Sequence, residues 1–78
     1  MNVEYLSQMV NDIAHYFAAE PEHAAGVSSI ADHLIRFWDP SMRQRIISHL
    51  EAGGAGLEPL AREAVQQLAA RQPRPGCS

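Results

Sequence analysis

The apolar residues at the start of this chain recur at helical intervals, and this spacing leaves the first segment one regular conformation. They are separated by three, four, three and four positions: Val3, Leu6, Val10, Ile13 and Phe17. Such residues share one face of an α-helix, whereas a half-buried strand alternates at every second position. Asn2 can cap the helix by accepting a hydrogen bond from a free amide. We therefore predict a helix over residues 3–19, with Met9 and Tyr16 widening the apolar face.

Three breaks divide the rest of the chain into further helical segments. Pro21 disfavours a helical conformation at Glu20 and can itself open the next helix. At the second break, Asp39 can cap a helix and Pro40 can occupy its first position. The segment GGAG at residues 53–56 is the third break, since glycine readily adopts the left-handed conformation that ends helices. The further predicted helices span residues 22–38, 40–52 and 58–70.

Length and patterning together predict one small all-α domain of four helices, the first two forming an antiparallel hairpin. No segment has the alternating pattern of a strand, and 78 residues are too few for a second core. We assign the domain to residues 1–70 and expect the proline-rich remainder, residues 71–78, to be a disordered tail. The predicted inward residues of the later helices are Val27, Ile30, Ala31, Leu34, Phe37, Met42, Ile46, Ile47, Leu50, Leu57, Leu60, Ala61, Ala64, Val65 and Leu68.

Charge balance and hydropathy argue against nucleic-acid and membrane partners. Six arginines and nine acidic residues leave a net charge of −3, although nucleic-acid-binding proteins usually carry a basic surface. No run approaches the roughly 18 apolar residues of a membrane span, and the N-terminus lacks a signal-peptide pattern. The single cysteine, Cys77, cannot form an internal disulfide. We expect a cytoplasmic protein with no nucleic-acid or membrane partner.

The candidate catalytic and metal-binding groups lack the spacing that such sites require. The histidines follow one another at intervals of 8, 10 and 16 positions: His15, His23, His33 and His49. Ligands on one helix face need a spacing of three or four positions. Ser28 or Ser29 with His33 has no evident third member or oxyanion hole. We expect no catalytic, cofactor-binding or metal-binding residue in this chain, and histidines that are solvated or singly hydrogen-bonded.

Residues 36–40, RFWDP, concentrate side chains that are frequent at protein interfaces. Phe37 continues the helical period and is predicted to pack inward. Trp38, the only tryptophan, is predicted to be displayed, because the flanking core faces already have other residues; Arg43 could cover its indole. Tryptophan and arginine are enriched among interface hot spots. The predicted partner-binding residues are Arg36, Trp38, Asp39, Met42, Arg43 and Arg45.

A compound signature runs through the second half of the chain. It comprises His33-Leu34, Arg36-Phe37-Trp38-Asp39-Pro40 and Met42-Arg43, then the glycine-rich turn and Leu57-x-Pro59-Leu60. With MVNDIAHYF near the N-terminus, this signature resembles the delta subunit of the cytoplasmic NAD-dependent formate dehydrogenases that use molybdenum or tungsten. The likeness covers almost the whole chain except the tail.

The resemblance implies a non-catalytic accessory subunit that binds the catalytic (alpha) subunit and stabilises or helps mature the complex. In such a complex the alpha subunit holds bis-molybdopterin guanine dinucleotide, and other subunits carry iron–sulfur clusters, FMN and the NAD site. Two other functions stay open. One is a small carrier that contacts the anionic cofactor through the arginine cluster, and the other is a helix-turn-helix regulator that binds DNA. An apolar patch awaiting its partner could also drive a homodimer of the isolated chain.

Overall fold

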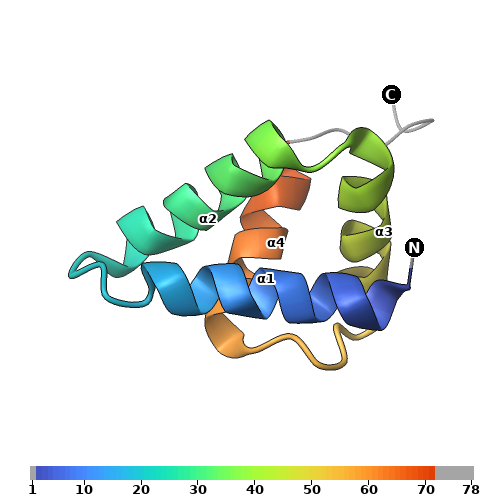
Figure 1. Cartoon of the computed structure of the whole chain (residues 1–78), viewed down its shortest axis with the longest axis horizontal. Coiled ribbons are helices and arrows are strands. Elements are labelled where there is room, and N and C mark those ends of the chain that lie inside the picture. The colour runs from blue at the N-terminus through green and yellow to red at the C-terminus, as the bar shows by residue number, and fades with distance from the viewer. Residues whose placement is uncertain (1, 72–78) are drawn as a thin grey trace.

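The computed structural model describes residues 2–71, which form four α-helices (Figure 1). These are α1 (Val3–Phe17), α2 (His23–Phe37), α3 (Pro40–Glu51) and α4 (Pro59–Arg71). The all-α class and the four helices are as predicted, with each boundary within two residues, and residues 2–71 contain no strand. The tail predicted over residues 71–78 lies outside the described residues, except for Arg71, which ends α4.

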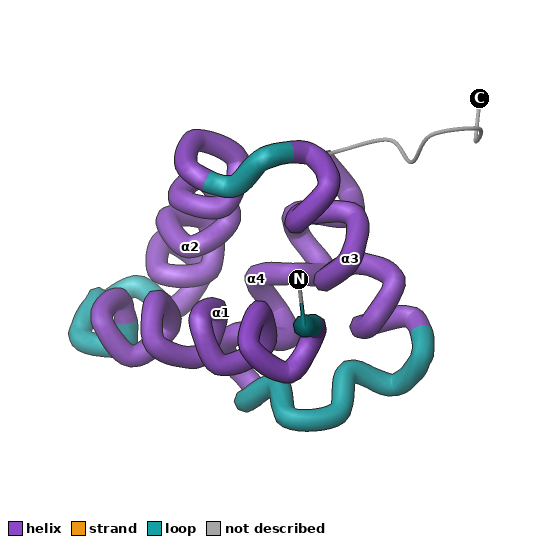
Figure 2. The backbone as a smooth tube through the Cα atoms, turned by 45° about the vertical axis from the view of Figure 1, so that its right-hand side comes forward, coloured by secondary structure: helices purple, strands orange, loops and turns teal. Residues whose placement is uncertain are grey.

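The helices surround one core. α1 and α2 run in opposite directions from a short turn, as predicted, and then diverge (Figure 1). α4 crosses behind them and packs most extensively against α2. α3 lies where α1 and α2 have diverged and packs against α4 and α1. The loop between α3 and α4 passes beside α1 (Figure 2), where the Asn11 amide donates to the Gly56 carbonyl at 2.8 Å and accepts from the Glu58 amide at 2.9 Å. One side chain of α1 therefore places the start of α4.

Local side-chain caps begin two of the helices. The Asn2 carbonyl oxygen accepts from the Glu4 amide at 2.8 Å, and the Asp39 carboxylate accepts from the Met42 amide at 2.9 Å. Both residues cap as predicted, and Pro40 occupies the first position of α3. The prediction that Pro21 opens the second helix is wrong. Its neighbour Glu22 is extended, so α2 begins only at His23.

Glycine ends α3, as predicted. The Gly53 amide donates to the Leu50 carbonyl at 3.0 Å, and the Gly54 amide donates to the His49 carbonyl at 2.9 Å. This bond pair is the Schellman pattern, which satisfies carbonyls that have no partner inside the helix. The Arg62 guanidinium on α4 then donates to the carbonyls of Gly53 and Gly54, at 3.0 and 3.1 Å. The end of α3 is thereby attached to α4.

The core confirms most of the predicted inward positions. Its buried members come from all four helices and their connections: Leu6, Val10, Ala14, Val27, Ile30, Leu34, Trp38, Ile46, Ile47, Leu57, Ala61, Ala64, Val65 and Leu68. Met9 is partly buried against this core, but Tyr16 is 79% exposed, so its predicted place on the core face is wrong. A helix turns by about 100° per residue. Tyr16 therefore points roughly 160° away from Ala14, which is buried.

Phe37 and Trp38 exchange the environments predicted for them. Trp38 is 5% exposed and belongs to the core, whereas Phe37 is 71% exposed. The prediction followed the three-residue step from Leu34 to Phe37, which falls short of a full helical turn by about 60°. The four-residue step to Trp38 overshoots by only about 40° and keeps the side chain on the buried face. The Trp38 amide still donates to the Leu34 carbonyl, at 3.0 Å, so the helical hydrogen bonding reaches this residue, although its own backbone is extended.

Candidate protein-interaction surface

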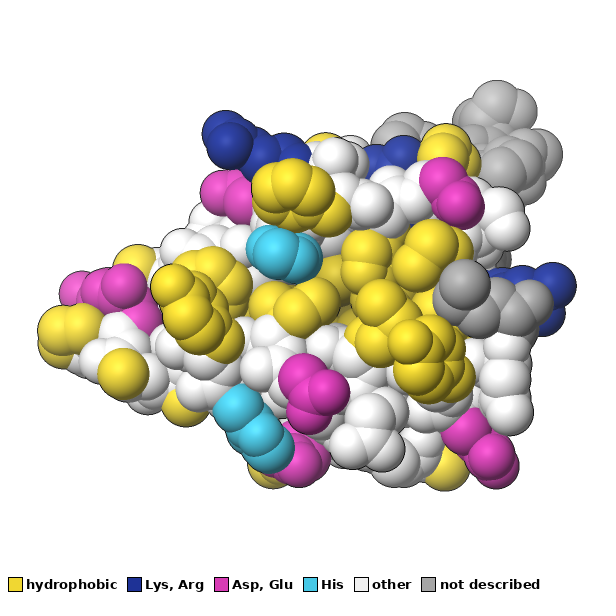
Figure 3. Space-filling view, in the orientation of Figure 1, with side chains coloured by type: hydrophobic (Ala, Val, Ile, Leu, Met, Phe, Trp, Pro, Cys, Tyr) yellow, Lys and Arg dark blue, Asp and Glu magenta, His cyan; other side chains and the backbone are white. Residues whose placement is uncertain are grey.

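Aromatic side chains gather on the surface along α1 and at the end of α2. Figure 3 shows hydrophobic side chains collected over the face that α1 turns toward the viewer. We call the part of this surface between α1 and α2 the aromatic face, and it comprises Ile13, Tyr16, Phe17, His33 and Phe37. Tyr16 and Phe37 are among the most exposed large hydrophobic side chains of the described residues. The chain thus buries its only tryptophan and exposes Tyr16 and Phe37.

Ring contacts order the aromatic face. The rings of Tyr16 and Phe17 are 5.0 Å apart in a T-shaped arrangement. On α2, the rings of His33 and Phe37 are 4.7 Å apart and tilted by 43°. Aromatic pairs at such distances attract each other beyond their simple burial. Each exposed ring therefore packs against a partly buried ring of its own helix.

Two shallow hollows follow the seam between α1 and α2. The first encloses about 260 Å³ and is lined by Asp12, Ile13, Tyr16, Phe17 and His33. The second encloses about 300 Å³ and is lined by Phe17, Ser29, Asp32, His33, Arg36 and Phe37. Phe17 and His33 line both hollows, so the hollows are adjacent and form one groove. The exposed surface that lines the first hollow is mostly apolar, with Asp12 at its edge, and suits an apolar side chain of a partner. The lining of the second hollow is about equally polar and apolar.

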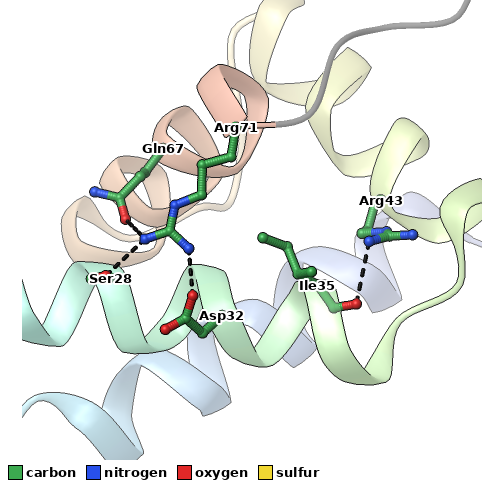
Figure 4. Close-up of polar contacts among 6 residues, drawn as sticks. All are labelled: Ser28, Asp32, Ile35, Arg43, Gln67 and Arg71. Atoms are coloured by element: carbon green, nitrogen blue, oxygen red, sulfur yellow. Dashed lines mark hydrogen bonds and ion pairs between the residues drawn. The ribbon is translucent and has the colours of Figure 1, made fainter.

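Charged groups lie at the edges of this groove. Asp32 accepts from Arg71 of α4, which also donates to the Ser28 hydroxyl at 2.7 Å and to the Gln67 side chain at 2.6 Å (Figure 4). Asp12 and Arg36 are exposed, and neither has a hydrogen-bond or ion-pair partner among residues 2–71. Among the described residues, the groove therefore has one charge of each sign at its edges without an ion-pair partner.

The predicted partner-binding residues do not form one surface. Arg36 is exposed at the edge of the aromatic face, and Arg45 is exposed in a separate hollow on α3 beside Ser41 and Ser48. Met42 is partly buried against the core. The structure divides the predicted cluster between two sides of α3 and the end of α2.

Three of the predicted residues have structural roles at the α2–α3 connection. Trp38 is buried, so the prediction that it is displayed is wrong, for the helical reason given above. Asp39 caps α3. Arg43 donates to the Ile35 carbonyl at 3.2 Å (Figure 4), where it satisfies a carbonyl of the last turn of α2. The stacking of Arg43 on the indole stays a prediction.

The aromatic face was not predicted as a site, although the sequence carries a signal for it. Tyr5, Met9, Ile13 and Phe17 recur at every fourth position of α1, beside the stripe that forms the core. Ser29, His33 and Phe37 repeat the same interval on α2. An apolar stripe wider than one packing face indicates a second contact surface.

Three histidines attach α4 and its preceding loop to the other helices. His15 of α1 contacts the Glu58 carboxylate at 2.7 Å, His23 of α2 contacts the Glu63 carboxylate at 2.9 Å, and His49 of α3 lies 2.7 Å from the Ala55 carbonyl. Each is singly hydrogen-bonded, as predicted. Within the described part of the chain, no group of three His, Cys, Asp or Glu side chains could hold a metal ion. No helix there is long and apolar enough to cross a bilayer.

Comparison with known proteins finds one family. The family model described as NADH-dependent formate dehydrogenase delta subunit FdsD matches residues 5–65. This range includes the aromatic face, the α2–α3 connection and the first half of α4. No curated protein and no solved structure matches the chain.

Proposed function

The chain belongs to the family of NADH-dependent formate dehydrogenase delta subunits, and we propose that it is a non-catalytic accessory subunit of that complex. It binds the catalytic (alpha) subunit and stabilises the complex or helps it mature. A delta subunit associates with the other subunits of its enzyme, so the chain needs a surface that contacts a protein.

The aromatic face is the observation that carries this proposal. Tyr16 and Phe37 expose most of their rings to solvent, although the fold has a core that buries Trp38. Exposed clusters of large apolar side chains on small proteins mark sites of association. Aromatic rings are also frequent among the residues that dominate binding energy at interfaces.

The redox groups of the proposed complex belong to its other subunits. Iron–sulfur clusters need several cysteine thiolates, and this chain has one cysteine, Cys77. We propose that the alpha subunit holds bis-molybdopterin guanine dinucleotide with molybdenum or tungsten, that the remaining subunits hold the iron–sulfur clusters, FMN and the NAD site, and that the complex is cytoplasmic.

The accessory role has more structural support than a role as cofactor carrier. A carrier of the anionic cofactor would need several arginines on one surface. In the structure, Arg43 donates to a backbone carbonyl, and Arg36 and Arg45 lie at different hollows.

Co-expression of the chain with the other subunits tests the proposed function. We expect that the double variant Tyr16→Ser, Phe37→Ser is lost from the purified complex and that the yield of active complex falls. Ile35→Ser is the matched control, because Ile35 is an exposed apolar residue of α2 outside the aromatic face. If the complex forms with unchanged yield and thermal stability when this chain is omitted altogether, the accessory role is wrong.

A further inference from the structure

The geometry points to one class of occupant for the aromatic face, and this inference rests on the proposed function. We propose that the groove binds a single amphipathic helix of another subunit of the formate dehydrogenase complex. The bound helix places a large apolar side chain in the first hollow and a side chain with both apolar and polar groups in the second, which has a mixed lining. It places a basic residue near Asp12 and an acidic residue near Arg36.

The side chains that line the groove are arranged to bind a helix. Its walls are two rows of side chains at four-residue intervals, Ile13 and Phe17 on α1, and Ser29, His33 and Phe37 on α2. Rows at this interval are the ridges between which the side chains of a third helix pack.

The length of the groove sets the spacing of the anchoring residues. The α2 side of the second hollow runs from Ser29 to Phe37, which is eight helical steps, or about 12 Å at the helical rise of 1.5 Å per residue. This length equals about two turns, so a bound helix would present apolar side chains at positions i, i+3 or i+4, and i+7.

Strand addition is not available on this surface. Recognition by an added strand needs an exposed sheet edge, and residues 2–71 contain no strand. Helices supply every wall of the groove, and a helix laid along them leaves none of its own backbone groups buried without a partner.

The edge charges determine the chemistry and the direction of the partner. Asp12 lines the first hollow and Arg36 lines the second, and neither is compensated by residues 2–71. Asp32 also lines the second hollow, but Arg71 already compensates it. A partner helix with a basic residue at the first hollow and an acidic residue at the second would pair both free charges. The opposite direction would place like charges together, which is unfavourable at an interface.

Family membership decides between another subunit and a second copy of this chain. A delta subunit works among other subunits of its complex, and those subunits are the partners present wherever the chain functions. A second copy on the aromatic face is therefore an outcome that the experiment must be able to detect.

The first measurement locates the partner segment. A photo-crosslinking amino acid replaces Tyr16 or Phe37 in the full chain, which is co-expressed with the other subunits, and the crosslinked peptides are identified. We expect both positions to crosslink to the same helix of another subunit, at sites on one face of that helix. Crosslinks to a loop, to a strand or to a second copy of this chain would overturn the proposal.

The second measurement tests the charge pairing. The association of the purified full chain with a preparation of the other subunits is followed at low and high salt. We expect Arg36→Glu to slow association about tenfold at low salt, with a smaller effect at high salt. Charges at the edge of an interface mainly change the association rate, and salt screens them. Arg45→Glu makes the same change of net charge at an exposed residue of α3 and should alter the rate less than about twofold.

The outcomes separate this inference from the proposed function. If Arg36→Glu and Arg45→Glu behave alike while the wild-type chain still binds the other subunits, the groove is not the binding site for a partner helix, and the accessory function stands. If the wild-type chain does not bind the other subunits under any condition, both proposals fail. Circular dichroism of each variant establishes that a lost interaction is not a lost fold.

Discussion

Arg62 and Gly54 fit closely against each other. The Arg62 guanidinium donates to the Gly54 carbonyl at 3.1 Å, and a Cβ atom at Gly54 would lie 2.8 Å from the Arg62 Nη1 atom. Gly54 also has a φ of +67°, which L-residues rarely adopt. The contact joins the end of α3 to α4. A side chain at position 54 would displace the Arg62 guanidinium from this contact.

We predict that Gly54→Ala destabilises the fold by about 2–3 kcal/mol. The positive φ accounts for roughly 1–2 kcal/mol, and the displaced Arg62 loses hydrogen bonds worth about 1 kcal/mol. Gly56→Ala is the control, because Gly56 also has a positive φ of 86° but no atom within 4 Å of the new Cβ. Urea unfolding measures both variants. An equal loss in the two would show that the Arg62 contact contributes nothing.

We predict that substitutions of the two adjacent aromatic residues affect different properties, stability for Trp38 and binding for Phe37. Trp38→Ala should cost about 3–5 kcal/mol, because it empties a site in the core. That loss approaches the whole stability of a small domain. Phe37→Ala should change stability by no more than about 0.5 kcal/mol and yet weaken binding to the other subunits. Unfolding curves and co-purification measure the two effects, and a similar loss of stability in both variants would contradict the structure.

We predict that Asp39→Ala destabilises the chain by about 1 kcal/mol, because the Met42 amide loses its cap. Asp39→Ser keeps an oxygen that can accept this bond and should recover most of the loss. Thermal unfolding of the isolated chain compares the three proteins. If the serine variant is no more stable than the alanine variant, the side chain of Asp39 matters for another reason.

We predict that Asn11→Ala is more destabilising than His15→Ala. Asn11 bonds two backbone groups of the loop before α4, and loss of both should cost about 1–2 kcal/mol. His15 makes one exposed contact, to Glu58, and such pairs contribute roughly 0–1 kcal/mol. Asn11→Asp can still accept from the Glu58 amide but cannot donate to Gly56, so its stability should fall between wild type and Asn11→Ala. Denaturant midpoints of the three variants give this order, and a larger loss from His15→Ala would reverse it.

The helices could be predicted because their signals are local. The caps at Asn2 and Asp39, the proline at position 40 and the glycines after α3 each act on groups a few residues away. The four-residue hydrogen bond of a helix needs nothing from distant parts of the chain. The corner at Asp39 and Pro40 could therefore be placed to the residue without any knowledge of the core.

The environments of Phe37 and Trp38 were harder to predict, although a local signal existed. The interval from Leu34 favoured Trp38 as the next inward residue. A tryptophan at a helix end can nevertheless pack inward or lie on the surface, depending on whether other helices leave space for it. The core of α1, α3 and α4 leaves that space.

The sequence by itself determined the four helices, their ends and most of their buried faces, because period and capping depend on near neighbours. Only the tertiary structure decided which surface stays open. Ile13 and Phe17 meet His33 because α1 and α2 turn back on each other, and Asp32 is compensated because the last residue of α4 reaches it. These contacts join residues far apart in the chain, and their geometry depends on how all four helices share one core. The aromatic face is one part of the apolar surface that this packing does not cover.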